Sequence, residues 1–135
     1  MADLVITTAD LELNNSRSRP TTVQAGLAVS IGQAIYLDTT TGKYSPADAD
    51  LSATADVAGI AITSADADGY LSMLSTTDLI LGATLVTGDP YFLSTNAGSI
   101  CSHSDLGAGD YVTLIGFASS TSVLELDITA TGIVI

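Results

Sequence analysis

Apolar and polar residues alternate along short stretches of the chain, and they do not follow a helical period. In the clearest stretch, Leu124, Leu126 and Ile128 alternate with charged or hydroxyl residues. Alternation with a period of two is typical of a strand that buries one face. The pattern predicts strands at 34–38, 43–45, 57–63, 70–75, 90–95, 98–102, 111–118, 122–128 and 131–135. A short turn or helix is expected only at 48–56.

Glycines lie where such strands must turn or curve. Gly42 and Gly98 stand where tight hairpins need a residue with positive φ. Gly59 and Gly116 lie inside apolar stretches, where a glycine indicates a β-bulge or a close approach of two backbones. Both features let a sheet curve. The predicted fold class is therefore all-β, a small barrel or sandwich.

The same order of strands and glycines occurs twice along the chain. At an offset of 56 residues, the identical pairs are Gly26 and Gly82, Gly32 and Gly88, Leu37 and Leu93, Thr39 and Thr95, and Gly42 and Gly98. After one inserted residue, the sequence VAGIA at 57–61 corresponds to LIGFA at 114–118. Self-similarity of this kind predicts a repeated structural unit. We expect one β domain, 25–135, built from two similar halves at about 25–80 and 81–135.

Residues 1–24 differ from this domain and are expected to form an extended N-terminal arm. The arm starts with a β-prone apolar run around Val5 and continues through turn-forming residues to Pro20, which restricts Arg19 to extended backbone. Two interpretations remain open. One is a frayed, solvated terminus, and the other is an arm that becomes ordered when it meets a partner.

Charge narrows the set of partners. Hydrophobic residues make up 47% of the chain and charged residues only 13%, yet the formal net charge is −12, from fifteen acids against Arg17, Arg19 and Lys43. A nucleic-acid binder needs a basic patch, and anionic membranes disfavour an acidic protein for the same reason. We therefore expect neither nucleic acid nor membrane as a partner. High acidity does favour solubility.

Other compositional signals point to one domain that is made in the cytosol. A length of 135 residues is typical of a single domain. The single cysteine, Cys101, excludes an intramolecular disulfide framework. The acidic start lacks a secretory leader, and no stretch reaches the ~18 apolar residues of a membrane helix.

Two local patterns are candidates for chemistry. Cys101 and His103 would share one face of a strand, as a thiolate–imidazole pair requires, but no third group or oxyanion hole is indicated. Asp66 and Asp68, followed by glycine, resemble the front half of a calcium loop, but Ser75 stands where the bidentate acid is needed. A packed cysteine and a solvated aspartate turn explain the same residues. We expect no enzyme, no metal and no cofactor.

Several blocks of the sequence resemble the small capsid cement, or head decoration, proteins of tailed phages. They are LGATLVTGDPYFLS at 81–94, AGDYVTLIGFA at 108–118, and the first-half versions GQAIYLD at 32–38 and DVAGIA at 56–61. The likeness covers about residues 22–130, and its motifs are turn-and-strand patterns. The resemblance implies a structural virion protein on the capsid exterior, commonly a homotrimer, which bridges subunits of the major capsid protein and is made in the host cytoplasm.

The resemblance also gives the arm a role. In related proteins an N-terminal arm often adds a strand to the capsid protein, and residues 1–20 occupy the corresponding place here. An apolar arm can augment an exposed sheet edge, and its arginines would reach acidic groups on the capsid subunit. The expected capsid-binding residues are Leu4, Val5, Ile6, Arg17, Arg19 and Pro20.

An interpretation from another class is a receptor- or carbohydrate-binding β-module of a phage tail or cell surface. Such modules usually present exposed Trp or Tyr side chains on which sugars stack. The chain has five Tyr and no Trp, which favours the capsid interpretation.

Overall fold

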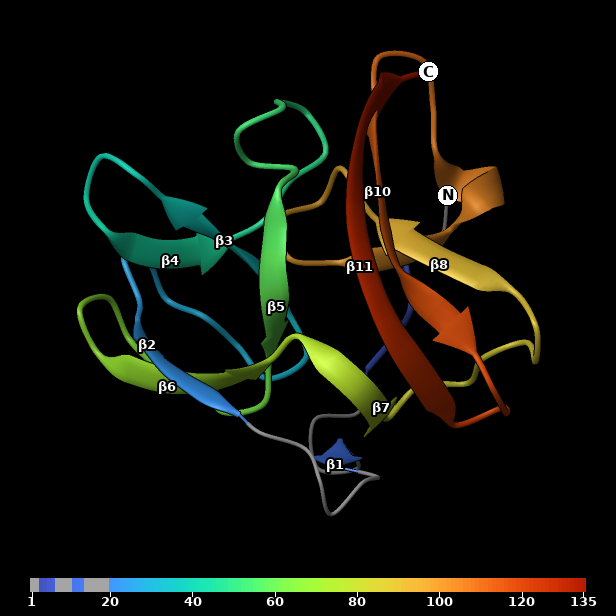
Figure 1. Ribbon diagram of the computed structural model, residues 1–135, viewed down its shortest axis with the longest axis horizontal. Coiled ribbons are helices and arrows are strands. Elements are labelled where there is room, and N and C mark those ends of the chain that lie inside the picture. The colour runs from blue at the N-terminus through green and yellow to red at the C-terminus, as the bar shows by residue number, and fades with distance from the viewer. Residues whose placement is uncertain (1–2, 7–10, 14–19) are drawn as a thin grey trace.

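The computed structural model describes residues 3–6, 11–13 and 20–135, which form two antiparallel β-sheets (Figure 1). Sheet A contains, in spatial order, β1 (Glu12–Leu13), β7 (Thr76–Ile80), β11 (Val123–Val134), β10 (Tyr111–Ala118), β8 (Pro90–Leu93) and β9 (Ile100–Ser102). Sheet B contains β2 (Thr21–Gln24), β6 (Tyr70–Leu74), β5 (Val57–Ala61), β3 (Ala34–Asp38) and β4 (Lys43–Pro46). One short 3-10 helix, η2 (His103–Asp105), interrupts the strands of the described chain. The predicted all-β fold class is confirmed.

The two sheets have the same strand order. Sheet B runs β2-β6-β5-β3-β4, and sheet A runs β7-β11-β10-β8-β9 once the two-residue strand β1 is set aside. Each sheet begins with a strand, β2 or β7, that lies just before the sequence-based boundary at residue 25 or 81. Neither strand was predicted. The separate terminal strand predicted at 131–135 is instead the last part of β11, which runs without a break to Val134.

Glycines shape both sheets as their positions suggested. Gly42 and Gly98 have φ values of 74° and 80°, so the turns before β4 and β9 use the left-handed conformation. Gly116 lies beside a register shift between β10 and β11, and a Cβ there would overlap the main-chain carbonyl oxygen of Glu125. Gly59 is less confined, because a Cβ there would lie 2.9 Å from Met73 Sδ and 3.0 Å from the Leu74 oxygen.

The apolar side chains form two clusters, one on each face of sheet B. Successive residues of one strand go to opposite faces, so Ala34 and Ile60 join the main cluster between the sheets while Ile35 and Ala61 join a smaller one. The smaller cluster also holds Val23, Ala25, Val29, Leu71 and Met73. Sheet B encloses this cluster because it curls until its edges meet, as the left half of Figure 1 shows.

Loops tie the two halves together around residues 47–55. The amide of Tyr111 donates to the Ala49 carbonyl at 2.9 Å, and the amide of Gly98 donates to the Ala47 carbonyl at 2.6 Å. The buried Thr113 hydroxyl donates to the carbonyl of Ala55. These bonds satisfy polar groups that would otherwise be buried without partners, and they fix the 47–55 loop against β10.

Candidate interaction surface

Cys101 and His103 do not form a reactive pair. β9 ends at Ser102 and His103 begins η2, so the shared strand face that the sequence suggested is wrong. The Cys101 side chain is fully buried, and this burial, followed by the nearby carboxylate of Asp3, raises its pKa to about 12. The thiol therefore stays protonated at neutral pH, and a protonated thiol is a poor nucleophile.

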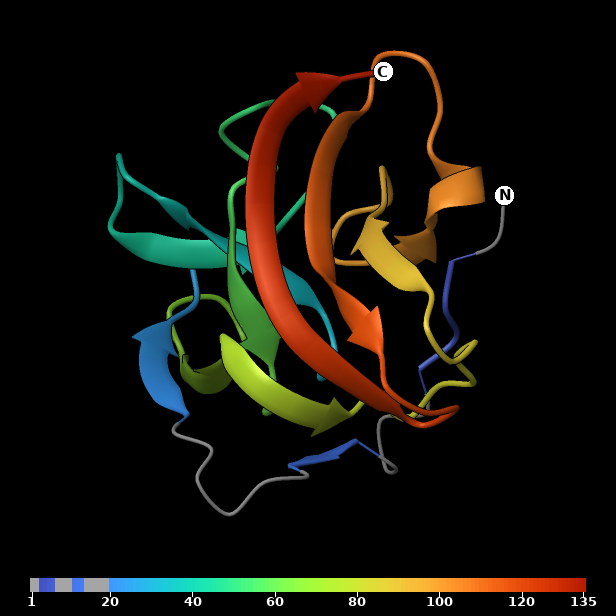
Figure 2. The same cartoon turned by 45° about the vertical axis from the view of Figure 1, so that its right-hand side comes forward.

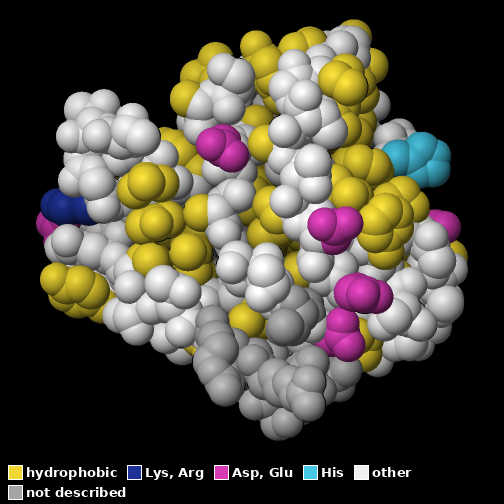
Figure 3. Space-filling view, viewed as in Figure 1, with side chains coloured by type: hydrophobic (Ala, Val, Ile, Leu, Met, Phe, Trp, Pro, Cys, Tyr) yellow, Lys and Arg dark blue, Asp and Glu magenta, His cyan; other side chains and the backbone are white. Residues whose placement is uncertain are grey.

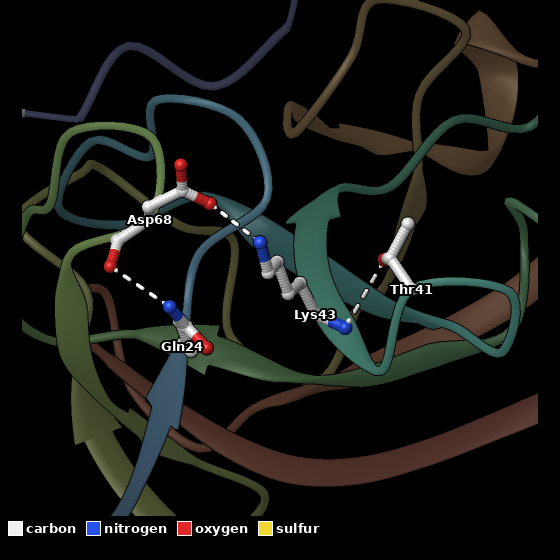
Figure 4. Close-up of polar contacts among 4 residues, drawn as sticks. All are labelled: Gln24, Thr41, Lys43 and Asp68. Carbon is white, nitrogen blue, oxygen red and sulfur yellow. Dashed lines mark hydrogen bonds and ion pairs between the residues drawn. The ribbon is translucent and has the colours of Figure 1, made fainter.

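The aspartates of the calcium-like loop do not converge on one point. Asp68 Oδ1 lies 2.6 Å from Lys43 Nζ, and the main-chain oxygen of Asp68 accepts a 3.0 Å hydrogen bond from Gln24 Nε2 (Figure 4). Asp68 has φ 70°, a value that aspartate tolerates in tight turns. This turn therefore joins β2 to β4. No group of three or more His, Cys, Asp or Glu within the described ranges is placed to hold a metal ion.

The structure places the apolar run of the arm against the protein's own body. Leu4 and Ile6 are half-buried and pack against the main core, whereas Val5 is 84% exposed. Pro20 is exposed and directly precedes β2. Arg17 and Arg19 lie outside the described residues. Of the six predicted contact residues, the structure thus brings Leu4 and Ile6 together on one side of a short extended segment.

That segment lies along the edge of β9. The Leu4 amide donates to the Ile100 carbonyl at 2.8 Å, and Asp3 forms an antiparallel bridge with Cys101. Tyr44 on β4 is the counterpart of Ile100 at the 56-residue offset, and its carbonyl accepts a 2.7 Å bond from the Gly26 amide. The same edge is therefore closed in both halves, in sheet B by the chain just after β2 and in sheet A by the arm.

The last part of β11 forms an exposed ribbon with β10, which is the tall hairpin in Figure 2. β7 pairs with β11 only from Val123 to Asp127, and beyond Asp127 β10 is the one strand paired with it in the described chain. We call residues 128–135 the C-terminal ribbon. Its final three residues are exposed by 62%, 47% and 54% and are Ile133, Val134 and Ile135.

Hydrophobic side chains gather at this end of the molecule (Figure 3). The sequence pattern predicted a strand at 131–135, but we did not predict that its apolar side chains would be exposed. A signal was present, since ITATGIVI at 128–135 carries no charge in a chain with fifteen acids. Loop residue Leu51 is also 62% exposed. An apolar exposed strand without a second strand partner is a template for pairing with another chain.

The outward face of sheet A has the opposite character. Glu125 on β11 lies directly opposite Asp78 on β7 and Phe117 on β10. Like charges placed opposite each other destabilise a sheet. Phe117 is 42% exposed beside these acids. The face is thus acidic and the C-terminal ribbon is neutral, so the two surfaces differ in the partners they could accept.

Two comparisons with known proteins were negative. A scan against protein-family models finds no family that matches the chain, and a search of curated proteins finds no match. Among the described residues, no helix is both long and apolar enough to span a membrane.

Proposed function

We propose that the chain is a structural protein that acts by binding another protein, and specifically that it is a cement protein of a tailed-phage head. The observation that carries the first part is the C-terminal ribbon, which presents an uncharged apolar strand on an otherwise acidic body. Exposed apolar patches on soluble proteins mark interaction sites. The blocks at 81–94 and 108–118, which resemble cement proteins, support the second part.

The proposed mechanism is thermodynamic linkage. A protein that binds the assembled shell and not its separated subunits shifts the equilibrium toward the shell. Attachment as a homotrimer would multiply modest contacts, because the second and third contacts form at high effective concentration. The partner is the major capsid protein on the head exterior, and each copy would bridge neighbouring subunits.

The ribbon can be tested with undecorated, expanded phage heads. We expect the double variant I133D/I135D to lose binding at least tenfold, because two carboxylates would be desolvated at the contact. Co-sedimentation with the heads measures the bound fraction. Leu27→Asp is the control, since Leu27 is as exposed as Ile133, at 62%, but lies in the loop after β2, in the other half of the protein. Full binding by I133D/I135D would remove the ribbon from the mechanism.

The arm is a second possible contact with the capsid. In the structure Leu4 and Ile6 occupy the protein's own β9 edge, so strand addition to a capsid subunit requires them to leave it. We expect a variant lacking residues 2–19 to bind undecorated heads more weakly in the same assay. Undiminished occupancy of the heads would remove the arm from the mechanism. If the wild-type protein bound to a glycan array and did not bind undecorated heads, the carbohydrate-binding alternative would replace the proposal.

A further inference from the structure

The β9 edge is a formed slot for a short strand. Besides the Leu4 bond to Ile100, Asn96 Nδ2 donates to Asp3 Oδ2 at 2.7 Å. A Cβ built on Gly32 would lie 3.0 Å from two carbon atoms of Ile6, so a glycine makes room for this side chain. Residues from distant parts of the fold therefore shape one site for residues 3–6.

Besides the packing of Leu4 and Ile6 on the main core, few hydrogen bonds hold the segment in this slot. One backbone hydrogen bond and one side-chain bond attach it to its neighbours among the described residues, and Val5 is turned out to solvent. Asp3 Oδ1 is buried and has no hydrogen-bond partner among the residues that the structure describes. A buried polar atom without a partner is unfavourable. The slot is thus well formed, while few hydrogen bonds among the described residues fix its occupant.

The chain between the segment and the body is long enough to reach another copy. From Ile6 to Thr21 there are fifteen residue steps, which span about 50 Å when fully extended. A 135-residue domain has a radius of gyration of about 14 Å, and hence a diameter of roughly 40 Å. This stretch is tied to the body where Glu12 and Leu13 of β1 pair with β7 and where Leu11 packs on the main core, so the full reach requires this short strand to detach.

We propose that residues 3–6 exchange between copies of the chain, so that the β9 slot of one copy accepts the segment of a second copy. Every copy carries both slot and segment, so exchange replaces each contact with an identical one, which makes it a low-cost route to an oligomer. Mutual exchange gives a two-fold dimer, and head-to-tail exchange closes a ring. This inference concerns self-association and does not depend on the phage-head function.

A cysteine at position 3 would trap the segment where it lies. Because the Leu4 amide bonds to Ile100, Asp3 and Cys101 face each other at the non-hydrogen-bonded position of the bridge, where opposing residues are closest. In Asp3→Cys, the new thiolate attacks glutathione disulfide and releases one glutathione thiol. Cys101, which faces it, then displaces the second glutathione thiol at alkaline pH, slowly because its own thiol is buried. A link within one chain keeps the monomer mass, whereas a link between chains doubles it or closes a larger ring.

After oxidation, the Asp3→Cys variant is compared with the wild type and with the control variants by non-reducing electrophoresis and mass spectrometry. We expect Asp3→Cys to give covalent oligomers that a reductant separates into monomers. The double variant D3C/C101S should not form them. Val5→Cys is the matched control, because Val5 points away from the slot and should give no more linked species than the wild type. Purely intramolecular links, or equal linking by Val5→Cys, would each overturn the proposal.

Folding of each variant is checked by circular dichroism. A full-chain variant with both slot contacts disrupted, L4D/I6D, gives a second measurement that needs no disulfide. We expect light scattering to find an oligomer for the wild type and for Val5→Asp, and a monomer for L4D/I6D. An oligomer that survives in L4D/I6D would show that copies associate elsewhere, and a wild-type chain that stays monomeric would equally overturn the exchange.

Discussion

Sheets A and B share one strand order but complete their edges differently. In sheet B the chain just after β2 closes the edge, through the 2.7 Å bond from the Gly26 amide to Tyr44. In sheet A the equivalent acceptor, Ile100, receives its 2.8 Å bond from Leu4, far away in sequence. β6 also stops at Leu74, whereas β11 continues to Val134. Sheet B therefore closes its edge with residues of its own half. Sheet A has the N-terminal segment on its β9 edge, and its strand β11 extends beyond the strands that pair with it on the other side.

This difference locates the surfaces available to partners. The two halves share the same frame of strands. We expect contacts with partners at the places where the structure of one half differs from that of the other. Both departures fall on strand edges, where unpaired main-chain groups can bind a further strand. Sheet B has an ion pair and a backbone bond at the corresponding place. The comparison thus predicts that changes in sheet B alter stability alone, while changes at the edges of sheet A also alter association.

The largest expected effect on stability comes from a substitution that disrupts the bulge between β10 and β11. In Gly116→Ala the new Cβ would overlap the Glu125 carbonyl, so we expect a loss of about 3 kcal/mol or more in the free energy of unfolding. Gly59→Ala in the other half should cost about 1–2 kcal/mol, because the Met73 side chain can move and the Leu74 oxygen, at 3.0 Å, is close but does not overlap the new Cβ. Urea unfolding of both variants measures the difference. Equal losses would show that the two bulges are equally confined.

A second test compares Cys101 with its counterpart Ser45, which lies at the equivalent position of β4. Burial raises the Cys101 pKa from 9.0 to about 12, so above pH 9 the folded state binds more protons than the unfolded state. Stability contributed by this group is therefore complete below pH 9 and is lost as the pH rises toward 12. We expect Cys101→Ser to flatten that part of the alkaline stability profile, measured by urea unfolding at each pH. Parallel profiles for variant and wild type would contradict a buried, protonated thiol.

The smallest expected effect concerns the ion pair of sheet B. Lys43 and Asp68 are 34% and 67% exposed, so Lys43→Met should change the free energy of unfolding by less than about 1 kcal/mol. The backbone bond from Gly26 to Tyr44 would then hold the sheet closed. Thermal unfolding at low and high salt measures the change. A loss of several kcal/mol would mean that the ion pair closes the sheet.

Local signals were sufficient to predict most of the strands. Alternating apolar residues predicted the central strands, and Gly42 and Gly98 predicted turns that the structure confirms. The sequences TTVQ and TTDLI of β2 and β7 gave no such signal, because a short strand with few apolar residues does not show a clear period. Their place is set by pairing with β6 and β11, which is a tertiary effect.

The candidate sites depended on contacts between distant residues, which no local pattern encodes. The apolar character of Leu4 and Ile6 indicated that they would be covered, but it did not indicate that β9 would cover them. The Cys101–His103 spacing suggested a shared face, and the early end of β9 at Ser102 removed it. Asp68 gave no sign that Lys43, 25 positions earlier, would face it.

The buried thiol has a practical consequence for labelling. Maleimide dyes react with accessible thiolates, and the chain's one cysteine offers neither access nor a thiolate at neutral pH. A cysteine introduced at an exposed position such as Leu27 would therefore carry a fluorophore without prior removal of Cys101. Single-molecule imaging of attachment can use the folded wild-type background directly.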